Sequence, residues 1–390
     1  MVSRPGWVAR LRSTLERVPI AWLSGVRRVG KTTLTRQLGD VEYLNCDLPS
    51  VAERARDPEE LLRSITARIV VLDEVHQLPD PSRLLKIAAD EFRRLRIVAT
   101  GSSTLAATSK FRDSLTGRKR TVELTPVLAE ELDAFGIAAL ERRLLHGGLP
   151  EALLADSPPA DFYAEWLDSY FARDVQELFR VAKRGAFLRF VELMLRQSGG
   201  MVEVTSLAKH VGVSRPTVIS WIDVLETTHV ARLLRPYHAG SRREIVAQPK
   251  AYGFDTGFVA WARGWTELRR SDVGPLWEHL VLDTLSYLGL AERTKFWRDK
   301  QQREVDFVVE RARGAKDAIE CNWSAEAFDP RGLLAFREYE QRGRNFVACA
   351  NVATPYTRTI KGLTVRFLSA RHLGVELGAP SLTRLRGGYI

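Results

Sequence analysis

The chain has 390 residues, enough for two or three domains, and its 45% hydrophobic and 27% charged residues are typical of globular proteins. No apolar run approaches the roughly eighteen residues of a membrane span, and the N-terminus lacks the apolar stretch of a secretory signal. We therefore expect a cytoplasmic protein without a membrane partner. The net charge of +10 favours a polyanionic partner, nucleic acid first. Three scattered cysteines without a CxxC pair argue against a zinc site or a disulfide framework.

Short, nearly all-apolar segments alternate with helical stretches in the first third of the chain. This pattern predicts an α/β fold with a parallel sheet covered by helices on both faces, and ligands bind such sheets at the carboxyl ends of the strands. The predicted strands are residues 20–24, 41–46, 68–72, 96–100 and 121–124.

The segment GVRRVGKTT, residues 25–33, matches GxxxxGK[ST] between a predicted strand and a predicted helix. Backbone N–H groups of such a loop surround phosphates, Lys31 would reach the β- and γ-phosphates, and Thr32 would coordinate Mg²⁺. ATP and Mg²⁺ are therefore the predicted cofactors. The residues expected to bind the nucleotide are Gly25, Arg27, Arg28, Val29, Gly30, Lys31, Thr32 and Thr33.

Two carboxylates follow the third predicted strand. Asp73 is placed to hold Mg²⁺ together with Thr32, and Glu74 is placed to polarise the attacking water. The fourth strand runs into Thr100 and Ser102, either of which could sense the γ-phosphate or align that water; a simple turn explains each residue equally well.

Hydrolysis also needs positive charge at the γ-phosphate in the transition state. Arg118, in the basic run 118–120, is the first candidate for an arginine finger or sensor, and Arg173 is the second. A surface salt bridge explains either arginine at least as well. If the chain forms a homo-oligomer, the arginine, or Arg27 and Arg28 of the loop, could act on a neighbouring subunit.

Residues 204–230 have the spacing of a helix-turn-helix, with Gly212 at the turn and Pro216 in the first turn of the second helix. Two extended stretches follow, 230–237 and 244–254, joined by a basic turn, as in a winged helix. DNA contact is one use of such a domain, and packing or regulation of an ATPase is the other. The residues expected to contact DNA are Lys209, Arg215, Thr217, Arg242 and Arg243.

A second α/β unit is predicted from residue 274 onward, with strands at 295–297, 304–310, 317–321, 345–350 and 363–367. Its carboxylates Glu278, Asp306 and Glu320 are similar in placement to the metal site of restriction-endonuclease-like folds. Those folds have a lysine two residues after the last carboxylate, where this chain has Asn322. Lys295 or Lys300 could substitute from a neighbouring strand.

The ordered set of motifs resembles prokaryotic AAA-type P-loop ATPases, close to the archaeal and signal-transduction ATPase group, that carry a C-terminal domain of unknown function. The resemblance implies ATP binding, ATP hydrolysis and a restriction-endonuclease-like C-terminal core. The matching positions are 25–32, 73–74, 100–102, 115–118, 147–151, 173–174, 249–255, 278, 298–299, 304–306 and 320.

The expected organisation is a P-loop ATPase core at 1–130, a helical lid at 131–198, a winged helix at 199–256 and a restriction-endonuclease-like domain at 257–390. The predicted function is Mg²⁺-dependent ATP hydrolysis coupled to DNA binding. Two alternatives remain: a nucleotide-gated switch for a protein partner, and an ATP-dependent nuclease.

Overall fold

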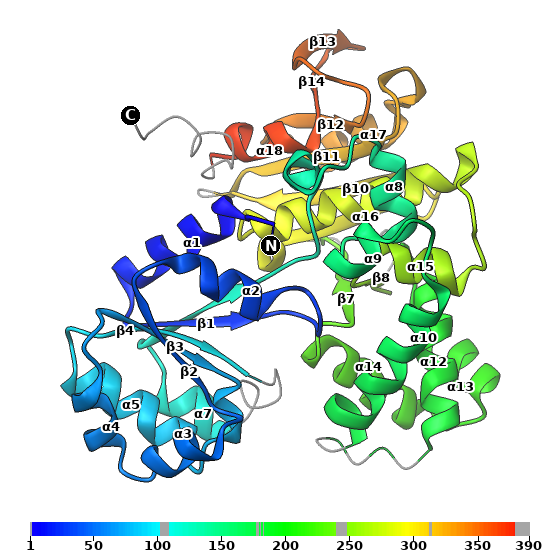
Figure 1. Ribbon diagram of the computed structural model, residues 1–390. Coiled ribbons are helices and arrows are strands. Elements are labelled where there is room, and N and C mark those ends of the chain that lie inside the picture. Colours follow the sequence, from blue (N-terminus) through cyan, green and yellow to red (C-terminus); the bar gives the residue numbers. More distant parts are fainter. Residues whose placement is uncertain are drawn as a thin grey trace. The chain divides into compact units, whose positions relative to one another are not determined.

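The computed structural model describes residues 2–101, 109–176, 179, 181, 183–238, 248–311 and 314–378 (Figure 1). The chain divides into two compact units, each with its own sheet and core. Unit 1 comprises Met1–Thr125, Ser169–Arg180 and Thr227–His229, and unit 2 comprises Pro126–Asp168, Val181–Glu226 and Val230–Ile390. Among the described residues, no helix is both long enough and apolar enough to cross a membrane.

The sheet of unit 1 is parallel throughout, with the strand order β2-β3-β4-β1-β5. This confirms the predicted parallel sheet, and the observed bounds differ from the predicted ones by at most two residues. The strands are β1 (Ile20–Ser24), β2 (Val41–Asn45), β3 (Ile69–Asp73), β4 (Arg96–Thr100) and β5 (Lys119–Glu123).

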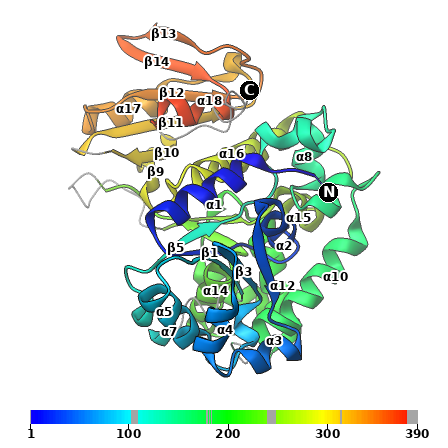
Figure 2. The same cartoon turned by 60° about the vertical axis from the view of Figure 1, so that its left-hand side comes forward.

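Helices cover both faces of this sheet (Figures 1 and 2). One face carries α1 (Pro5–Arg17) and α2 (Lys31–Thr35), and the other carries α3 (Pro49–Arg54), α4 (Pro58–Ser64), α5 (Pro81–Glu91) and α7 (Ser109–Ser114). Proline in the first turn and an aspartate cap fix where α4 and α5 begin, because the caps Asp57 and Asp80 accept backbone N–H bonds of the first turn. Short segments of unit 1 are η1 (Arg36–Leu38), η2 (Val75–Gln77) and the π-helical η4 (Phe171–Gln176).

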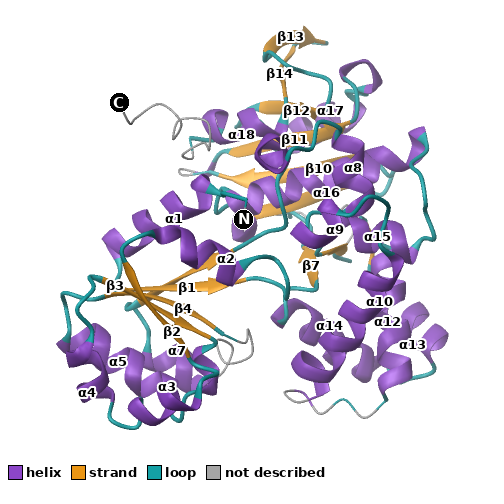
Figure 3. Cartoon of the chain, in the orientation of Figure 1, coloured by secondary structure: helices purple, strands orange, loops and turns teal. Residues whose placement is uncertain are grey.

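The larger sheet of unit 2 has six strands in the order β13-β14-β12-β11-β10-β9. Its strands are β9 (Thr294–Arg298), β10 (Glu304–Glu310), β11 (Lys316–Asn322), β12 (Asn345–Cys349), β13 (Tyr356–Ile360) and β14 (Leu363–Leu368). The strand β13 was not predicted, because it lies at the sheet edge and its residues are exposed or half-buried, which leaves no apolar pattern. Apolar clusters place α16 (Arg270–Tyr287) and α18 (Ala370–Glu376) on one face and α17 (Arg331–Tyr339) on the other (Figure 3).

The rest of unit 2 is mostly helical, with a small antiparallel sheet in the order β6-β8-β7. The strands are β6 (Gly200–Met201), β7 (Ala231–Leu234) and β8 (Lys250–Gly253). The strand β7 is shorter than the predicted stretch 230–237, and β8 lies in the described part of the predicted stretch 244–254. The helical segments are η3 (Ala129–Phe135), α8 (Leu140–His146), α9 (Pro150–Leu154), α10 (Ala160–Tyr170), α12 (Arg184–Arg196), α13 (Val204–Val211), α14 (Arg215–Thr227), α15 (Thr256–Ala262), η5 (Ala291–Arg293) and η7 (Ala325–Ala327).

A buried polar junction explains two of the glycine-containing motifs of unit 2. Asp255 accepts hydrogen bonds from the N–H groups of Gly148 (2.6 Å) and Gly257 (2.8 Å). Gly147 has φ +76°, and a Cβ atom there would lie 1.8 Å from Asp255 Oδ1. The fully buried Arg143 donates to Thr256 Oγ1 at 2.7 Å. These motifs therefore hold α8 and α15 together.

Candidate nucleotide site

The loop between β1 and α2 has the backbone of a phosphate-binding loop. Gly25 has φ +135°, and a Cβ atom there would lie 2.6 Å from Leu124 O, so only glycine fits. Arg28 and Gly30 also have positive φ, 61° and 101°. Alternating positive and negative φ turns successive N–H groups toward one concavity, which suits an anion.

Lys31 lies against this loop. Its Nζ donates to Gly25 O at 2.8 Å and to Val26 O at 3.1 Å. Burial lowers the pKa of Lys31, although the charges of Glu74 and Asp174 oppose that shift. Among the described residues, its hydrogen-bond acceptors are two loop carbonyls, so this half-buried ammonium group is well placed to bind phosphate oxygens.

Asp73 lies at the centre of a hydrogen-bond network that spans three strands. It is 4% exposed and accepts bonds from Thr32 Oγ1 at 2.9 Å, from the hydroxyl of Tyr43 on β2, and from Thr100 Oγ1 at the end of β4. Burial, followed by the hydrogen bond to Asp73, raises the pKa of Tyr43. A hydroxyl and a carboxylate in contact are the oxygen donors that Mg²⁺ prefers, so Thr32 and Asp73 fit the predicted ion.

Thr100 also positions Glu74, because its Oγ1 accepts the Glu74 N–H at 2.9 Å. Glu74 has φ +57°, a conformation that is costly for a residue other than glycine and that recurs at functional sites. Its Oε2 lies 3.3 Å from His76 Nδ1, and its side chain is 36% exposed. The sequence left Thr100 and Ser102 open as alternatives; Thr100 belongs to the network, and Ser102 lies outside the described residues.

The structure does not place Arg118 where it could act as an arginine finger on the nucleotide of its own chain. Its carbonyl accepts the N–H of Ile20, the first residue of β1, whereas the loop follows the last residue of β1. Because β5 is parallel to β1, Arg118 lies at the amino ends of these strands, whereas the loop lies at their carboxyl ends. Its guanidinium pairs with both carboxylate oxygens of Asp90, at 2.5 and 3.0 Å. The alternative interpretation, a salt bridge, describes this arginine.

The segment Phe171–Gln176 does reach the loop, through a different residue from the one expected. Arg173 is exposed, while Asp174 Oδ2 lies 3.0 Å from Nε of Arg27 in the loop. Arg27 therefore has a carboxylate partner within unit 1, and Arg173 remains a candidate only by its position beside Asp174.

His229 is a site residue that sequence reasoning missed. Its Nε2 lies 2.7 Å from Oγ of Ser24, the last residue of β1, and its Nδ1 lies 3.6 Å from Oε1 of Glu123 on β5. The preceding Thr228 contacts the Tyr170 hydroxyl at 2.8 Å. All of these residues belong to unit 1. His229 is 205 residues from Ser24 in the sequence, and no local sequence pattern indicates that the two side chains meet.

A separate carboxylate cluster lies in unit 2. Oxygens of Glu278, Glu304 and Asp306 lie within 4.8 Å of one another. Burial, followed by the charge of Glu278, raises the pKa of Asp306 to about 8. Burial, followed by the charges of Asp306 and Glu304, raises the pKa of Glu320. The gathered oxygens thus come from two of the three predicted carboxylates, Glu278 and Asp306, and from Glu304, while Glu320 contacts Asp306.

The lysine of this cluster is neither of those that the sequence suggested. Lys295 pairs with Glu310 at 3.5 Å, and Lys300 is exposed. Instead, Nζ of Lys250 on β8 lies 3.1 Å from Glu278 Oε1 and also bonds Glu304. Burial alone would lower the pKa of Lys250, but the charges of Glu278, Asp306 and Glu304 outweigh it and raise that pKa.

Two of the residues expected to contact DNA lie exposed on neighbouring helices. These are Lys209 on α13 and Arg215 at the start of α14. Thr217 is half-buried, and its hydroxyl lies 2.8 Å from the hydroxyl of Ser214, so it belongs to the start of the helix. Arg242 and Arg243 lie outside the described residues.

Comparison with protein families places these two sites in different domains. Residues 17–132 match an AAA domain. Residues 137–269 and 273–365 match two domains of unknown function, DUF8612 and DUF4143. The nucleotide loop, Asp73 and Glu74 thus lie in the AAA match, and Glu278, Glu304, Asp306 and Glu320 lie in the last one. The parallel sheet with this loop resembles the core of a P-loop ATPase.

Uncharacterized proteins of Mycobacterium bovis and Mycobacterium tuberculosis are each 29% identical over 322 residues, which cover 80% of this chain and 72% of theirs.

Solved structures show weaker likenesses. A STAND signal-transduction ATPase with a tetratricopeptide repeat sensor from Pyrococcus horikoshii is 11% identical with a TM-score of 0.25, and the match covers 73% of this chain but only 45% of that one. The Bacillus subtilis DNA clamp loader delta protein is 10% identical with a TM-score of 0.26, over 56% of this chain and 88% of that one. Drosophila ORC bound to DNA is 14% identical with a TM-score of 0.23, over 66% and 85%. At TM-scores this low, none of the three bears on the function of this chain.

Proposed function

We propose that this chain is a Mg²⁺-dependent ATPase. The observation that carries the proposal is the network in which Thr32, Asp73 and Thr100 connect the loop to Glu74 through consecutive hydrogen bonds. The AAA match over residues 17–132 supports it independently. A phosphate-binding loop alone would be consistent with mere binding, whereas a carboxylate placed beside it supplies a group that can act on water.

Each residue of the site would have its own part in the chemistry. Lys31 and the loop N–H groups would bind the β- and γ-phosphates. Thr32 and Asp73 would hold Mg²⁺, which when bound neutralises phosphate charge. Glu74 would orient the attacking water and polarise it, with its backbone held by Thr100. Ser102 remains a second candidate for aligning that water.

The proposed output is DNA binding coupled to nucleotide state. We interpret α13, α14 and the sheet β6-β8-β7 as a winged helix, with residues 131–198 as a helical lid. The exposed Lys209 and Arg215 support a polyanionic partner, as does the net charge of +10. Coupling would pass through the segment Thr227–His229, which begins with the last residue of α14 and whose His229 contacts Ser24 beside the loop.

Steady-state ATP hydrolysis tests this proposal, with and without duplex or branched DNA, on the wild type and on Glu74→Gln. We expect Glu74→Gln to bind ATP but to lose turnover by about a hundredfold or more, since it removes the group that polarises water. Glu60→Gln is the matched control, because Glu60 is an exposed glutamate of α4 in the same unit. Equal turnover by Glu74→Gln and the wild type would contradict the proposal.

A protein partner is the second candidate for the output. Ile219 on α14 is 49% exposed, so it would be accessible to such a partner. ATP turnover that is abolished by Glu74→Gln yet indifferent to every DNA would favour this candidate. Nuclease activity is not part of the proposal, because Lys250 lies among the carboxylates that would hold its metal ion.

A further inference from the structure

The carboxylate cluster of unit 2 is in contact with a cation that belongs to the chain. The Lys250 side chain is only 5% exposed, and its ammonium group bonds two carboxylates, Glu278 and Glu304, whose side chains are 16% and 23% exposed. A buried charge is stable only when it is paired and hydrogen-bonded, and this lysine meets both conditions.

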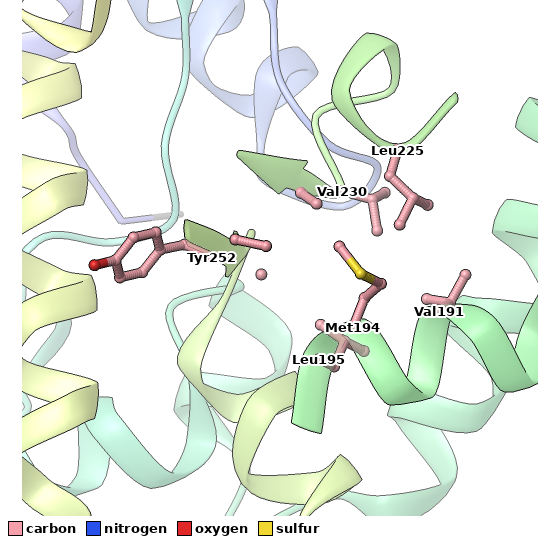
Figure 4. A pocket seen from close by; sticks show the side chains of 9 residues that line it. Val191, Met194, Leu195, Leu225, Val230 and Tyr252 are labelled. Carbon is pink, nitrogen blue, oxygen red and sulfur yellow. The ribbon is translucent and has the colours of Figure 1, made fainter. Parts of the chain in front are cut away.

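The strand β8 directs a second polar group to the same cluster. Lys250 and Tyr252 are two residues apart on β8, so their side chains leave the same face of the strand. The Tyr252 ring points away from Met194 and Leu225 of an apolar pocket (Figure 4). Its hydroxyl donates to Glu278 Oε1, the oxygen that Lys250 also bonds. The bonds from Lys250 and Tyr252 thus both go to Glu278 Oε1, an oxygen that a metal ion in this cluster would also use.

The other carboxylates of the cluster are engaged as well. Arg298 Nε lies 3.3 Å from Glu304 Oε2, and Asp306 Oδ2 accepts the Cys321 N–H at 2.8 Å. The helix α17 packs closely here, because a Cβ atom on Gly332 would lie 1.9 Å from Glu304 O and 2.8 Å from Glu320 Oε1. The positive charge of the ammonium group among these carboxylates repels a divalent ion, and the contacts occupy oxygen lone pairs that such an ion would use.

We propose that the ammonium group of Lys250 is the resident cation of this cluster and takes the place of a divalent metal ion. Position 322 has no lysine, and Lys250 of β8 supplies one instead. It acts as the counter-ion of the carboxylates and does not assist a bound metal ion. The pairing joins β8, and with it the sheet β6-β8-β7, to α16 and β10. This inference concerns unit 2 alone and does not depend on the ATPase proposal.

Removing the Lys250 side chain should convert the cluster into a metal site. The experiment uses the full chain without nucleotide and measures Mn²⁺ binding by calorimetry, and thermal unfolding with and without Mn²⁺. We expect Lys250→Ala to lower the melting temperature of unit 2 by roughly 10 °C, because it leaves carboxylates unpaired. We also expect it to gain Mn²⁺ affinity by about tenfold or more, with part of the melting temperature restored by Mn²⁺.

The double variant Lys250→Ala/Glu304→Gln is the matched control, and it should lose the gained Mn²⁺ binding. Mn²⁺ binding by the wild type that Glu304→Gln removes would overturn the proposal, and so would a Lys250→Ala variant that gains no Mn²⁺ binding. Should Lys250→Ala not fold, the wild type and Glu304→Gln alone still decide. Equal Mn²⁺ binding by these two supports the proposal, and stronger binding by the wild type contradicts it.

Discussion

At the scale of single residues, the nucleotide site is organised around one buried carboxylate. Asp73 receives hydroxyl donors from α2, β2 and β4, so its two oxygens are held in fixed directions before any ion binds. Thr100 has two roles, since the same oxygen donates to Asp73 and accepts from the Glu74 N–H. Residues that orient the ligands of a metal ion in this way commonly change activity by about ten- to a hundredfold when they are replaced.

Thr100→Val should therefore lower kcat by about ten- to a hundredfold, because valine keeps the shape and loses both hydrogen bonds. The KM for ATP should change much less, since the loop and Lys31 remain intact. Steady-state kinetics at varied Mg²⁺ would measure both. Thr125→Val is the matched control, because Thr125 is equally buried and its hydroxyl has no hydrogen-bond partner among the described residues. A Thr100→Val enzyme with wild-type kcat would exclude this positioning role.

At the scale of elements, the short segment η3 contains Glu130, whose carboxyl group is partly buried and therefore unfavourable in its charged form. Glu131 caps the segment by accepting the Leu128 N–H at 3.0 Å. The neighbouring Glu130 is half-buried as a residue, but its Oε2 is fully buried without a hydrogen-bond partner among the described residues. Burial raises the pKa of Glu130 from 4.5 to about 7. The folded chain thus holds the proton more tightly than the unfolded chain does.

The free energy of unfolding should consequently fall as the pH rises from 4.5 to 7, because the unfolded chain releases this proton first. Glu130→Gln should raise the stability of unit 2 by about 2 kcal/mol at pH 8 and change it much less at pH 4.5, where Glu130 is protonated in the folded chain and half protonated in the unfolded chain. Thermal or urea unfolding across this pH range would measure the difference. Glu141→Gln, at an exposed position of α8, is the control. A stabilisation by Glu130→Gln that is the same at both pH values would contradict the assignment.

At the scale of the whole molecule, the chain crosses several times between the two units. The chain passes from one unit to the other at residues 125/126, 168/169, 180/181, 226/227 and 229/230. The shortest segment of unit 1 is Thr227–His229, which begins with the last residue of α14 and precedes β7. His229 lies two residues beyond the end of α14 and contacts Ser24, the last residue of β1.

His229→Ala should reduce the stimulation of ATP turnover by DNA by a larger factor than it reduces basal turnover, since it removes the contact with Ser24. His229→Asn should restore part of the stimulation, because asparagine tolerates the positive φ of 60° at this position and keeps a hydrogen-bonding side chain. ATP hydrolysis over a DNA titration would measure both. His372→Ala is the control, because it removes a similar histidine–serine contact, to Ser369, at the start of α18. A proportional fall of basal and stimulated turnover would exclude a coupling role.

The sequence alone determined the parallel sheet, the phosphate-binding loop and the two carboxylates at the end of β3, because each of these is a local pattern. An apolar strand, a glycine that must adopt positive φ and a charged residue at a strand end are all visible within a few neighbouring positions. The family pattern also singled out Glu278, Asp306 and Glu320, although the strand order that joins them was not visible.

Only the tertiary structure decided which distant side chains complete each site. Tyr43 and Thr100 reach Asp73 from neighbouring strands, and Lys250 reaches Glu304 from 54 residues away. Arg118 was a candidate because it is basic and follows the fourth predicted strand, but the structure places it directly before β5, at the amino ends of the strands and remote from the loop. Hydrogen bonds and ion pairs depend on distances in space, and for residues on separate elements those distances are set by how the sheets and helices pack.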